Sequence, residues 1–263
     1  MNRIIVFALM FFCMTMQIEA QTLSEEEVTA KMYQAFELNK AAKKAEALEL
    51  FLIVGENTKQ QRNEGERQVY VCSQTMACQC YELLGRYKEG YLLGKSLLQG
   101  KLNDTERKDV GHLYAMNGYM YACEFIQRDE KGRADYKRGR ELISEILPYS
   151  DGQVKEYAET KIPLSWYFEG AQYAMTQSYD EALSSYEEAL NGFRDLGRVS
   201  EEVDVLSGIA SVKAHLCKFD EAKRVYYQAF VLAHQNGKVN KQMDVLRELW
   251  SLGNSTGDMK LIR

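Results

Sequence analysis

The stretch that decides the fold is WYFEGAQYAMTQSYDEALSSYEEA, residues 166–189. Small and aromatic residues recur at i, i+4 and i+7 on two predicted helices: Trp166, Gly170 and Tyr173 on the first, and Ala182, Tyr186 and Ala189 on the second. Gly170 and Ala182 are small enough to let two antiparallel helix backbones approach closely. The aromatic side chains fill the space beside this contact. The stretch therefore predicts a packed pair of antiparallel helices.

This spacing resembles the tetratricopeptide repeat, whose pattern is Trp-x2-Leu-Gly-x2-Tyr, then Ala-x3-Phe, then Pro. The chain departs from the pattern at Glu169, Tyr186 and Arg194, which replace the Leu, the Phe and the Pro. The resemblance implies an all-α protein, a right-handed α-solenoid of antiparallel helix pairs. It implies nothing about catalysis.

A second copy of the motif follows the first. KFDEAKRVYYQA at residues 218–229 matches SYDEALSSYEEA at residues 178–189, and 222 minus 182 gives an offset of 40 residues. The usual period is about 34 residues, so we expect each helix to be longer by nearly one turn. The resemblance is specific from Trp166 to Phe230 and looser from Leu23 to Arg263, which predicts about five helix pairs.

Helix boundaries can be predicted at several other places. Ser24 followed by Glu27 is typical of a capping box, so a helix is expected to begin there. We expect Gly55 to end the second helix and Pro163 to lie in the first turn of the helix that carries Trp166. A last helix is expected at residues 241–252, followed by too few residues for its partner. The last repeat is therefore expected to be incomplete, as in a truncated product or a piece of a longer protein.

The N-terminus is typical of a signal peptide. Arg3 precedes an uncharged apolar run at residues 4–16, and a cleavage region ends at Ala20. Residues 1–20 are thus assigned to a signal peptide, and residues 21–263 to the repeat domain. The alternative is an uncleaved anchor, although the apolar run is shorter than the roughly 20 residues of a membrane span. The expected location is the periplasm, either as an exported chain or tethered to the membrane in a longer parent protein.

Composition excludes several classes of function. The net charge of -5 gives no basic footprint for nucleic acid. Five cysteines remain after the predicted cleavage, and their spacing fits neither a disulfide framework nor a zinc site, so we expect them to be small buried residues. No nucleophile motif, phosphate loop or dinucleotide fingerprint occurs, and the three histidines lack ligand partners at suitable spacing. We therefore predict a protein that is not an enzyme and that has no cofactor or metal.

The resemblance does imply a groove. In solenoids of this family, the first helix of each pair lines the concave side, and the groove positions follow by register from Trp166. The predicted groove residues are Thr75, Gln79, Glu82, Tyr167, Ala171, Met175, Asp204, Ser207, Ser211, His215, Arg247, Ser251 and Asn254. Their mixed polarity suits a peptide or a protein segment better than an apolar cofactor. A solvated surface without a ligand is the other interpretation.

The functional hypothesis is a non-enzymatic protein-binding or peptide-binding module. The predicted signal peptide followed by long repeats resembles the exported sensory region of signalling or transcriptional regulators of Bacteroides-like bacteria. The alternatives are a free periplasmic assembly factor or chaperone adaptor, and a helical-repeat glycan-binding protein. A helical hydrolase is disfavoured because the catalytic residues are missing. Self-association through the uncapped last repeat is also predicted, because Leu246, Leu249 and Trp250 lack a covering helix.

Overall fold

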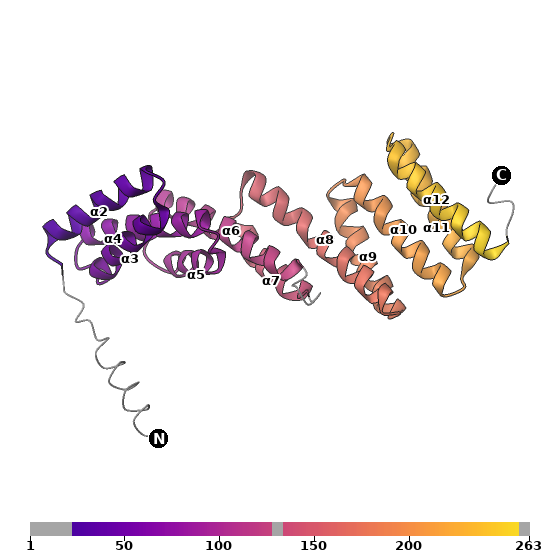
Figure 1. Ribbon diagram of the computed structural model, residues 1–263, viewed down its shortest axis with the longest axis horizontal. Coiled ribbons are helices and arrows are strands. Elements are labelled where there is room, and N and C mark those ends of the chain that lie inside the picture. Colours follow the sequence, from indigo (N-terminus) through magenta and orange to yellow (C-terminus); the bar gives the residue numbers. More distant parts are fainter. Residues whose placement is uncertain (1–22, 128–133, 258–263) are drawn as a thin grey trace, which may run out of the picture. The chain divides into compact units, whose positions relative to one another are not determined.

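The computed structural model describes residues 23–127 and 134–257, and all regular structure within these ranges is helical. The chain divides into two compact units, unit 1 at Met1–Leu113 and unit 2 at Tyr114–Arg263. Figure 1 labels the helices of both units. The predicted signal peptide lies outside the described residues. Within them, no helix is both long enough and apolar enough to cross a membrane.

Unit 1 is built from antiparallel neighbours in chain order. Its helices are α2 (Glu25–Lys40), α3 (Lys44–Thr58), α4 (Glu64–Leu83), α5 (Tyr87–Leu98) and the first part of α6 (Asp104–Ile126). The predicted capping box at the start of α2 is confirmed: the Glu27 amide donates to Ser24 Oγ at 3.3 Å, and the Ser24 amide donates to Glu27 Oε2 at 2.8 Å. The core between α2, α3 and α4 forms around Phe51, which is fully buried.

The prediction that Gly55 ends a helix is wrong, because α3 continues through it to Thr58. Gly55 is buried, and a Cβ atom placed on it would meet the Gln74 side chain of α4. The Gln74 amide in turn donates to the Phe51 carbonyl at 3.4 Å. The glycine therefore marks a close crossing of α3 and α4, where a larger side chain would separate the helices.

An ion-pair network joins α4 to the start of α6. The Arg67 guanidinium contacts Glu64 at 2.8 Å and Glu106 at 2.9 Å, and the side chains of Arg67 and Glu106 are both largely buried. Hydrogen bonds from Arg67 hold the pKa of the Glu106 carboxyl below its usual range. Glu106 also accepts the Asn103 amide at 2.9 Å, so one carboxylate both caps α6 and ties it to α4.

Unit 2 continues the arrangement with longer helices. They are the rest of α6, α7 (Tyr136–Ile146), the short 3-10 helix η1 (Leu147–Tyr149), α8 (Gly152–Met175), α9 (Tyr179–Asp195), α10 (Val199–His215), α11 (Phe219–Gln235) and α12 (Val239–Thr256). From α7 onward each α-helix packs against the next one in the chain. One continuous core runs through α9, α10, α11 and α12.

The 40-residue offset has a simple structural origin. Helices α9, α10 and α11 are each 17 residues long, and three-residue turns separate them. The residue in the left-handed region of each turn recurs every 20 positions, at Gln177, Gly197, Cys217 and Gly237. The expectation of helices extended beyond the usual repeat length is therefore confirmed.

The predicted position of Pro163 is wrong. Pro163 lies inside α8, which begins at Gly152, and not in its first turn. Proline in a helix interior removes one backbone hydrogen bond. Here the ring is buried against α9, since a Cβ placed on Gly192 would lie only 2.8 Å from the Cβ of Pro163. Tertiary packing thus holds the helix continuous through the proline.

Glu169, which departs from the repeat pattern, has a specific partner. Its carboxylate contacts the Arg140 guanidinium of α7 at 2.8 Å, and both side chains are largely buried. The same guanidinium lies over the Trp166 ring at 3.4 Å from its centroid. The polar residue therefore replaces an apolar contact with a charged one between α7 and α8.

The cysteines follow the prediction only in part. Cys78, Cys80 and Cys123 are buried, as expected, and burial raises the pKa of the Cys78 thiol to about 12. Cys72 and Cys217 are exposed, so the prediction is wrong for these two. Cys217 occupies the left-handed position of the turn after α10, which faces solvent, and Cys72 lies on the solvent-facing side of α4. All five described thiols are unbridged.

Within each unit, the described residues form the predicted all-α arrangement of antiparallel helix pairs. Short connections place consecutive helices side by side, and small residues at the crossings bring their backbones together. The assignment of residues 21–263 to one repeat domain stays a prediction.

Candidate functional site

The candidate site is the face of unit 2 formed by α8, α10 and α12. These are the first helices of successive pairs, and α10 packs against both of the others. Ten of the predicted groove residues lie on them: Tyr167, Ala171, Met175, Asp204, Ser207, Ser211, His215, Arg247, Ser251 and Asn254. We call this face the unit 2 groove.

The 40-residue period gives each of these groove residues an equivalent on the next first helix. Three rows result: Tyr167, Ser207 and Arg247; Ala171, Ser211 and Ser251; Met175, His215 and Ser255. The middle row is small, and small side chains leave room between first helices. In these rows the residues on α8 are apolar or aromatic and those on α12 are polar. The two sides of the groove therefore differ in chemistry.

A cavity of about 440 Å³ lies where the groove passes from α10 to α12. It is lined by Ser211, Ala214, His215, Phe219, Tyr226, Glu248, Ser251, Leu252 and Ser255. Three of the predicted groove residues, Ser211, His215 and Ser251, are thus brought together in one hollow. A volume of this size is within the range of about 300–1,000 Å³ that is common for ligand sites.

Tyr226 forms the polar floor of this cavity. Its ring is in the core, and its hydroxyl shares a hydrogen bond with Ser211 and lies near the Glu248 carboxylate. Burial, with a smaller contribution from Glu248, raises the Tyr226 pKa to about 12. The hydroxyl therefore stays protonated at neutral pH and can both donate and accept a hydrogen bond.

An ion pair lies at the other end of the groove from the cavity. Lys241 Nζ of α12 contacts the Asp204 carboxylate of α10 at 2.6 Å. Tyr167 of α8 lies close to this pair: burial raises the Tyr167 pKa, Asp204 raises it further, and Lys241 opposes the change. The ion pair thus joins α10 to α12 near the ends where these helices begin.

The wall beside the cavity is apolar and aromatic. The His215 ring stacks on Tyr179 at 6.0 Å between centroids, with planes 7° apart. Phe219, four residues after His215, is exposed and lines the cavity. Met175, the equivalent of His215 on α8, is also exposed. This edge can receive an apolar side chain, while the serines and Glu248 offer hydrogen bonds.

Two of the predicted groove residues lie outside the lining of this cavity. Asn254 is exposed but does not line the cavity, whereas Ser255 does, and adding 40 to His215 would have pointed to Ser255. Tyr167 is half-buried and packs on Tyr186 at 5.8 Å between ring centroids, so it supports the fold as well as the groove.

The sequence did not identify four residues of the groove: Lys241, Tyr226, Glu248 and Ser255. For the tyrosine, the reason is physical: its spacing predicts a core position, and only the structure shows that its hydroxyl reaches the groove.

Two further predicted groove residues form bonds within their own helices. Arg247 is exposed and pairs with Asp244 at 3.2 Å. Ser207 donates to the Val203 carbonyl at 3.0 Å, as helical serines often do.

The other three predicted residues are in unit 1. Thr75, Gln79 and Glu82 lie on α4, and Thr75 Oγ1 donates to the Val71 carbonyl at 2.7 Å. Gln79 is exposed. Burial raises the pKa of the Glu82 carboxyl, and His112 of α6 partly offsets this shift. These residues form a polar face of α4.

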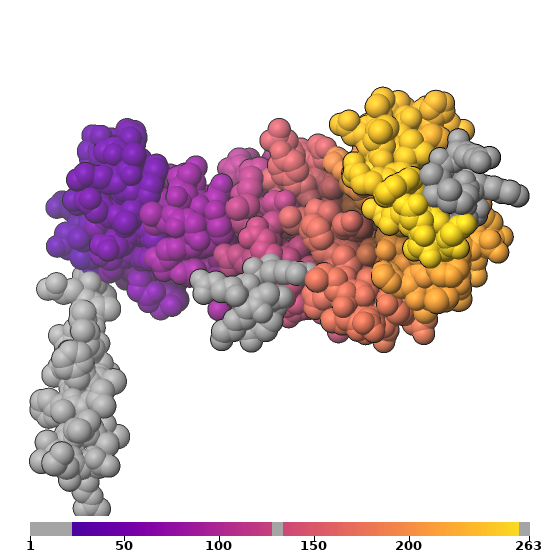
Figure 2. Space-filling model, turned by 45° about the vertical axis from the view of Figure 1, so that its right-hand side comes forward, coloured from indigo at the N-terminus to yellow at the C-terminus, as the bar shows by residue number. Residues whose placement is uncertain are grey.

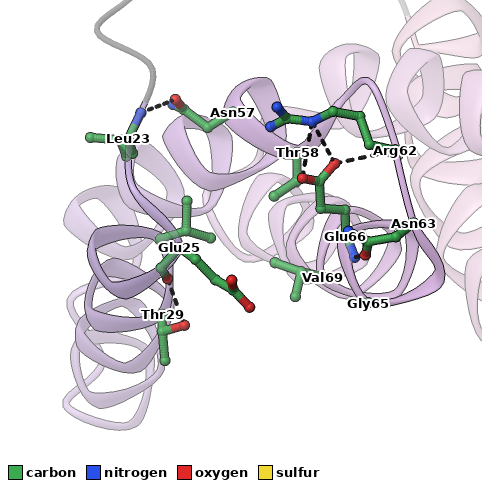
Figure 3. Close-up of a pocket in the computed structure, with 11 residues that line it drawn as sticks. Leu23, Glu25, Thr29, Asn57, Thr58, Arg62, Asn63, Gly65, Glu66 and Val69 are labelled. Carbon is green, nitrogen blue, oxygen red and sulfur yellow. Dashed lines mark hydrogen bonds and ion pairs between the residues drawn. The ribbon is translucent and has the colours of Figure 1, made fainter.

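A second cavity, of about 540 Å³, lies at the N-terminal end of unit 1 between α2, α3 and α4 (Figure 3). Its polar groups are largely used by the fold. Glu66 accepts the Arg62 amide at 2.9 Å and pairs with the Arg62 guanidinium at 3.1 Å, and Asn57 accepts the Leu23 amide at 2.9 Å. Asn63 caps α4 by accepting the Glu66 amide. We therefore place the candidate site in the unit 2 groove, where Glu248 and Ser251 bond to no other described side chain.

The described residues contain no cluster of His, Cys, Asp or Glu side chains that could hold a metal ion. His215, the histidine in the groove, stacks on a tyrosine instead. The groove as described is therefore a surface of hydrogen-bonding and apolar groups.

No protein-family model matches the chain, and no curated protein matches its sequence. Among solved structures, the apo form of RapI is 14% identical, with 90% of this chain and 80% of RapI covered and a TM-score of 0.34. A thermophilic TPR protein of Thermus thermophilus is 15% identical, with coverages of 83% of this chain and 96% of the other and a TM-score of 0.32.

A third solved structure, a putative kinesin light chain of Podosopora anserina with nearly identical TPR-like repeats, is 14% identical to this chain. The coverages are 81% of this chain and 97% of the other, with a TM-score of 0.33.

Proposed function

We propose that the unit 2 groove binds a segment of a protein partner and that the chain acts as a non-enzymatic interaction module. The observation that supports this most directly is the cavity between α10 and α12. It combines hydrogen-bonding groups with an apolar wall at Phe219. A peptide offers the matching chemistry, with backbone donors and acceptors beside apolar side chains.

The expected bound segment has an apolar side chain and an uncharged or basic polar flank. The apolar side chain would lie against Phe219 and Met175, both of which are exposed. A basic flank would satisfy Glu248, whereas an acidic flank would be repelled by it. This gives the groove a preference that can be tested with defined peptides.

We further propose that the module is exported to the periplasm as the sensory repeat region of a signalling or transcriptional regulator. The support is the charged start, apolar core and Ala20 of the N-terminal segment. In this role, partner binding in the groove would be the sensed event. We also propose that the chain associates with a second copy through α12.

The groove proposal predicts that Ser251→Arg weakens peptide binding by at least about 10-fold, about 1.4 kcal/mol. The long charged side chain would fill the cavity beside Glu248 and Ser211. The probe is a peptide selected from a random phage-displayed library on the parent protein, and titration by fluorescence anisotropy measures its affinity. Tyr167→Ala is unsuitable as a probe, because Tyr167 packs on Tyr186.

The matched control is Ser184→Arg, the same substitution at an exposed serine of α9 outside the cavity. We expect Ser184→Arg to bind as the parent does, and both variants to melt at the parent temperature. Equal binding by Ser251→Arg and the parent would show that the peptide does not enter the cavity.

The export proposal predicts that the mature chain begins at Gln21. Expression from the native start in a Gram-negative host, followed by fractionation and N-terminal sequencing, measures this. Phe7→Arg with Phe11→Arg interrupts the apolar core and should retain the chain in the cytoplasm. Recovery of the parent in the cytoplasm with Met1 intact would contradict the proposed location.

A further inference from the structure

The cavity between α10 and α12 has an acidic lining. Glu248 is the acidic residue among those that line it, and the lining contains neither lysine nor arginine. Figure 2 shows α12, the helix that carries Glu248, in yellow at the surface of unit 2. Glu248 is exposed, so a partner can reach its carboxylate from solvent. The cavity therefore favours a positively charged group.

Two cations on the same helices are paired elsewhere. Lys213 Nζ of α10 contacts the Glu221 carboxylate at 2.7 Å, and the Arg247 guanidinium of α12 contacts Asp244 at 3.2 Å. The Glu248 carboxylate forms no ion pair with a residue that the structure describes. A cation supplied by a partner would therefore not have to displace one that belongs to this chain.

The hydroxyl groups of the cavity leave more hydrogen-bond acceptors than donors. Ser255 donates its proton to the Leu252 carbonyl at 2.9 Å. Tyr226 and Ser211 share a hydrogen bond, which uses one of their two protons. Each hydroxyl oxygen can still accept a bond, and the carboxylate has about four acceptor sites and no proton. The lining therefore matches a group that is rich in N–H donors.

Unit 2 already holds one guanidinium in such an environment. The Arg140 guanidinium lies over the Trp166 ring at 3.4 Å from its centroid, contacts the Glu169 carboxylate at 2.8 Å and donates to Ser165 Oγ at 3.4 Å. The cavity presents the same three kinds of group. It has a carboxylate, serine hydroxyls and the exposed ring of Phe219.

We propose that the cavity binds an arginine side chain of the partner segment, with the guanidinium between the Glu248 carboxylate and the Phe219 ring. This inference rests on the proposed peptide binding and names the residue that enters the cavity. Arginine suits the site better than lysine, because a guanidinium is planar and has five N–H donors for the carboxylate and hydroxyl oxygens. Its methylene groups can lie along the apolar wall.

The experiment compares variants of one peptide by fluorescence anisotropy at low salt. The probe is the phage-selected peptide of the groove titration, which we expect to contain arginine. Replacing that arginine with citrulline, which keeps the shape but removes the charge, should weaken binding at least about 10-fold. Replacing it with lysine should weaken binding at least about 3-fold, because the fork of donors is lost.

A substitution in the protein tests the same contact from the other side. Glu248→Gln should weaken the arginine peptide at least about 10-fold and change the affinity of the citrulline peptide less than about 2-fold, because each change removes the same interaction. The matched control is Glu187→Gln at an exposed glutamate of α9 outside the cavity, which should bind as the parent does. Circular dichroism of both variants checks that the helices remain folded.

The outcomes separate this inference from the proposed function. Peptide binding that Ser251→Arg does not weaken would contradict the groove itself. Binding that Ser251→Arg weakens, but that neither citrulline nor Glu248→Gln changes, would overturn the arginine and leave the groove in place. A selected peptide without arginine that still enters the cavity would do the same. Equal affinity of the arginine and lysine peptides would overturn the choice of a guanidinium.

Discussion

Phe51→Ala is expected to destabilise unit 1 by about 3–5 kcal/mol, the largest effect of any substitution considered for this protein. The Phe51 ring is fully buried between α2, α3 and α4. It meets Phe36 edge-on, with centroids 5.5 Å apart and planes at 76°. Its other neighbours include Ala35, Ala47 and Ala77, whose methyl groups are too short to fill the cavity that the substitution leaves.

Urea denaturation measures this loss, and amide exchange locates it. We expect faster exchange in α2, α3 and α4, because solenoid repeats contact chiefly their neighbours. Ile53→Ala, two residues away on the exposed side of α3, is the matched control and should cost less than about 1 kcal/mol. Equal unfolding of the two variants would show that the core of unit 1 is not centred on Phe51.

The helices of unit 2 could be predicted because each structural feature has a local signature. Small and aromatic residues repeat at helical spacing, and the turn at residues 176–178 lies between two such rows. The helix boundaries predicted at Gly55 and Pro163 were wrong for a common reason. Each is a residue that usually ends or begins a helix, yet here each is buried at a helix crossing, against Gln74 and Gly192 respectively. Contacts distant in sequence override local preference at these positions.

From the sequence, only residues on the first helix of each pair could be assigned to the candidate site. Register from Trp166 identified Ser211, His215 and Ser251, because a helical face repeats at fixed spacing. It did not identify Tyr226, whose ring occupies a core position while its hydroxyl reaches the cavity. A pattern of apolar and polar residues assigns each side chain to one environment, so a tyrosine that spans two environments requires the structure.

The exposed apolar residues Met243, Leu246 and Trp250 of α12 show how the repeat period helps to interpret the exposure of single residues. Exposure alone does not distinguish a solvated apolar side chain from an unoccupied contact. The equivalent positions on α10, Val203, Leu206 and Ala210, do, because they are buried in the core that α10 shares with α11. Comparison between repeats of one chain thus serves as an internal reference for which surfaces are built to be covered.

Gly170→Leu is expected to destabilise unit 2 by about 1–3 kcal/mol through overpacking. A Cβ atom on Gly170 would lie 2.8 Å from Cδ1 of Tyr186 and 3.2 Å from the Ala182 carbonyl oxygen, both on α9. The carbonyl belongs to the α9 backbone and can move only with the helix. The Tyr186 ring cannot turn away easily, because its far end meets Gly208 of α10, where an added Cβ would lie 2.8 Å from Cζ.

Thermal melts should therefore rank the parent as most stable, Gly170→Ala next and Gly170→Leu as least stable. Alanine gains helix propensity of about 1 kcal/mol over glycine, which offsets part of its clash, whereas the longer leucine cannot avoid both α9 contacts. Ser184→Leu, at an exposed helical position of α9, is the control for adding leucine to a helix and should melt near the parent. Because Tyr186 separates α8 from α10, displacing it should also widen the groove and weaken peptide binding. A Gly170→Leu melt that coincides with the Ser184→Leu melt would mean that α8 and α9 do not cross at Gly170.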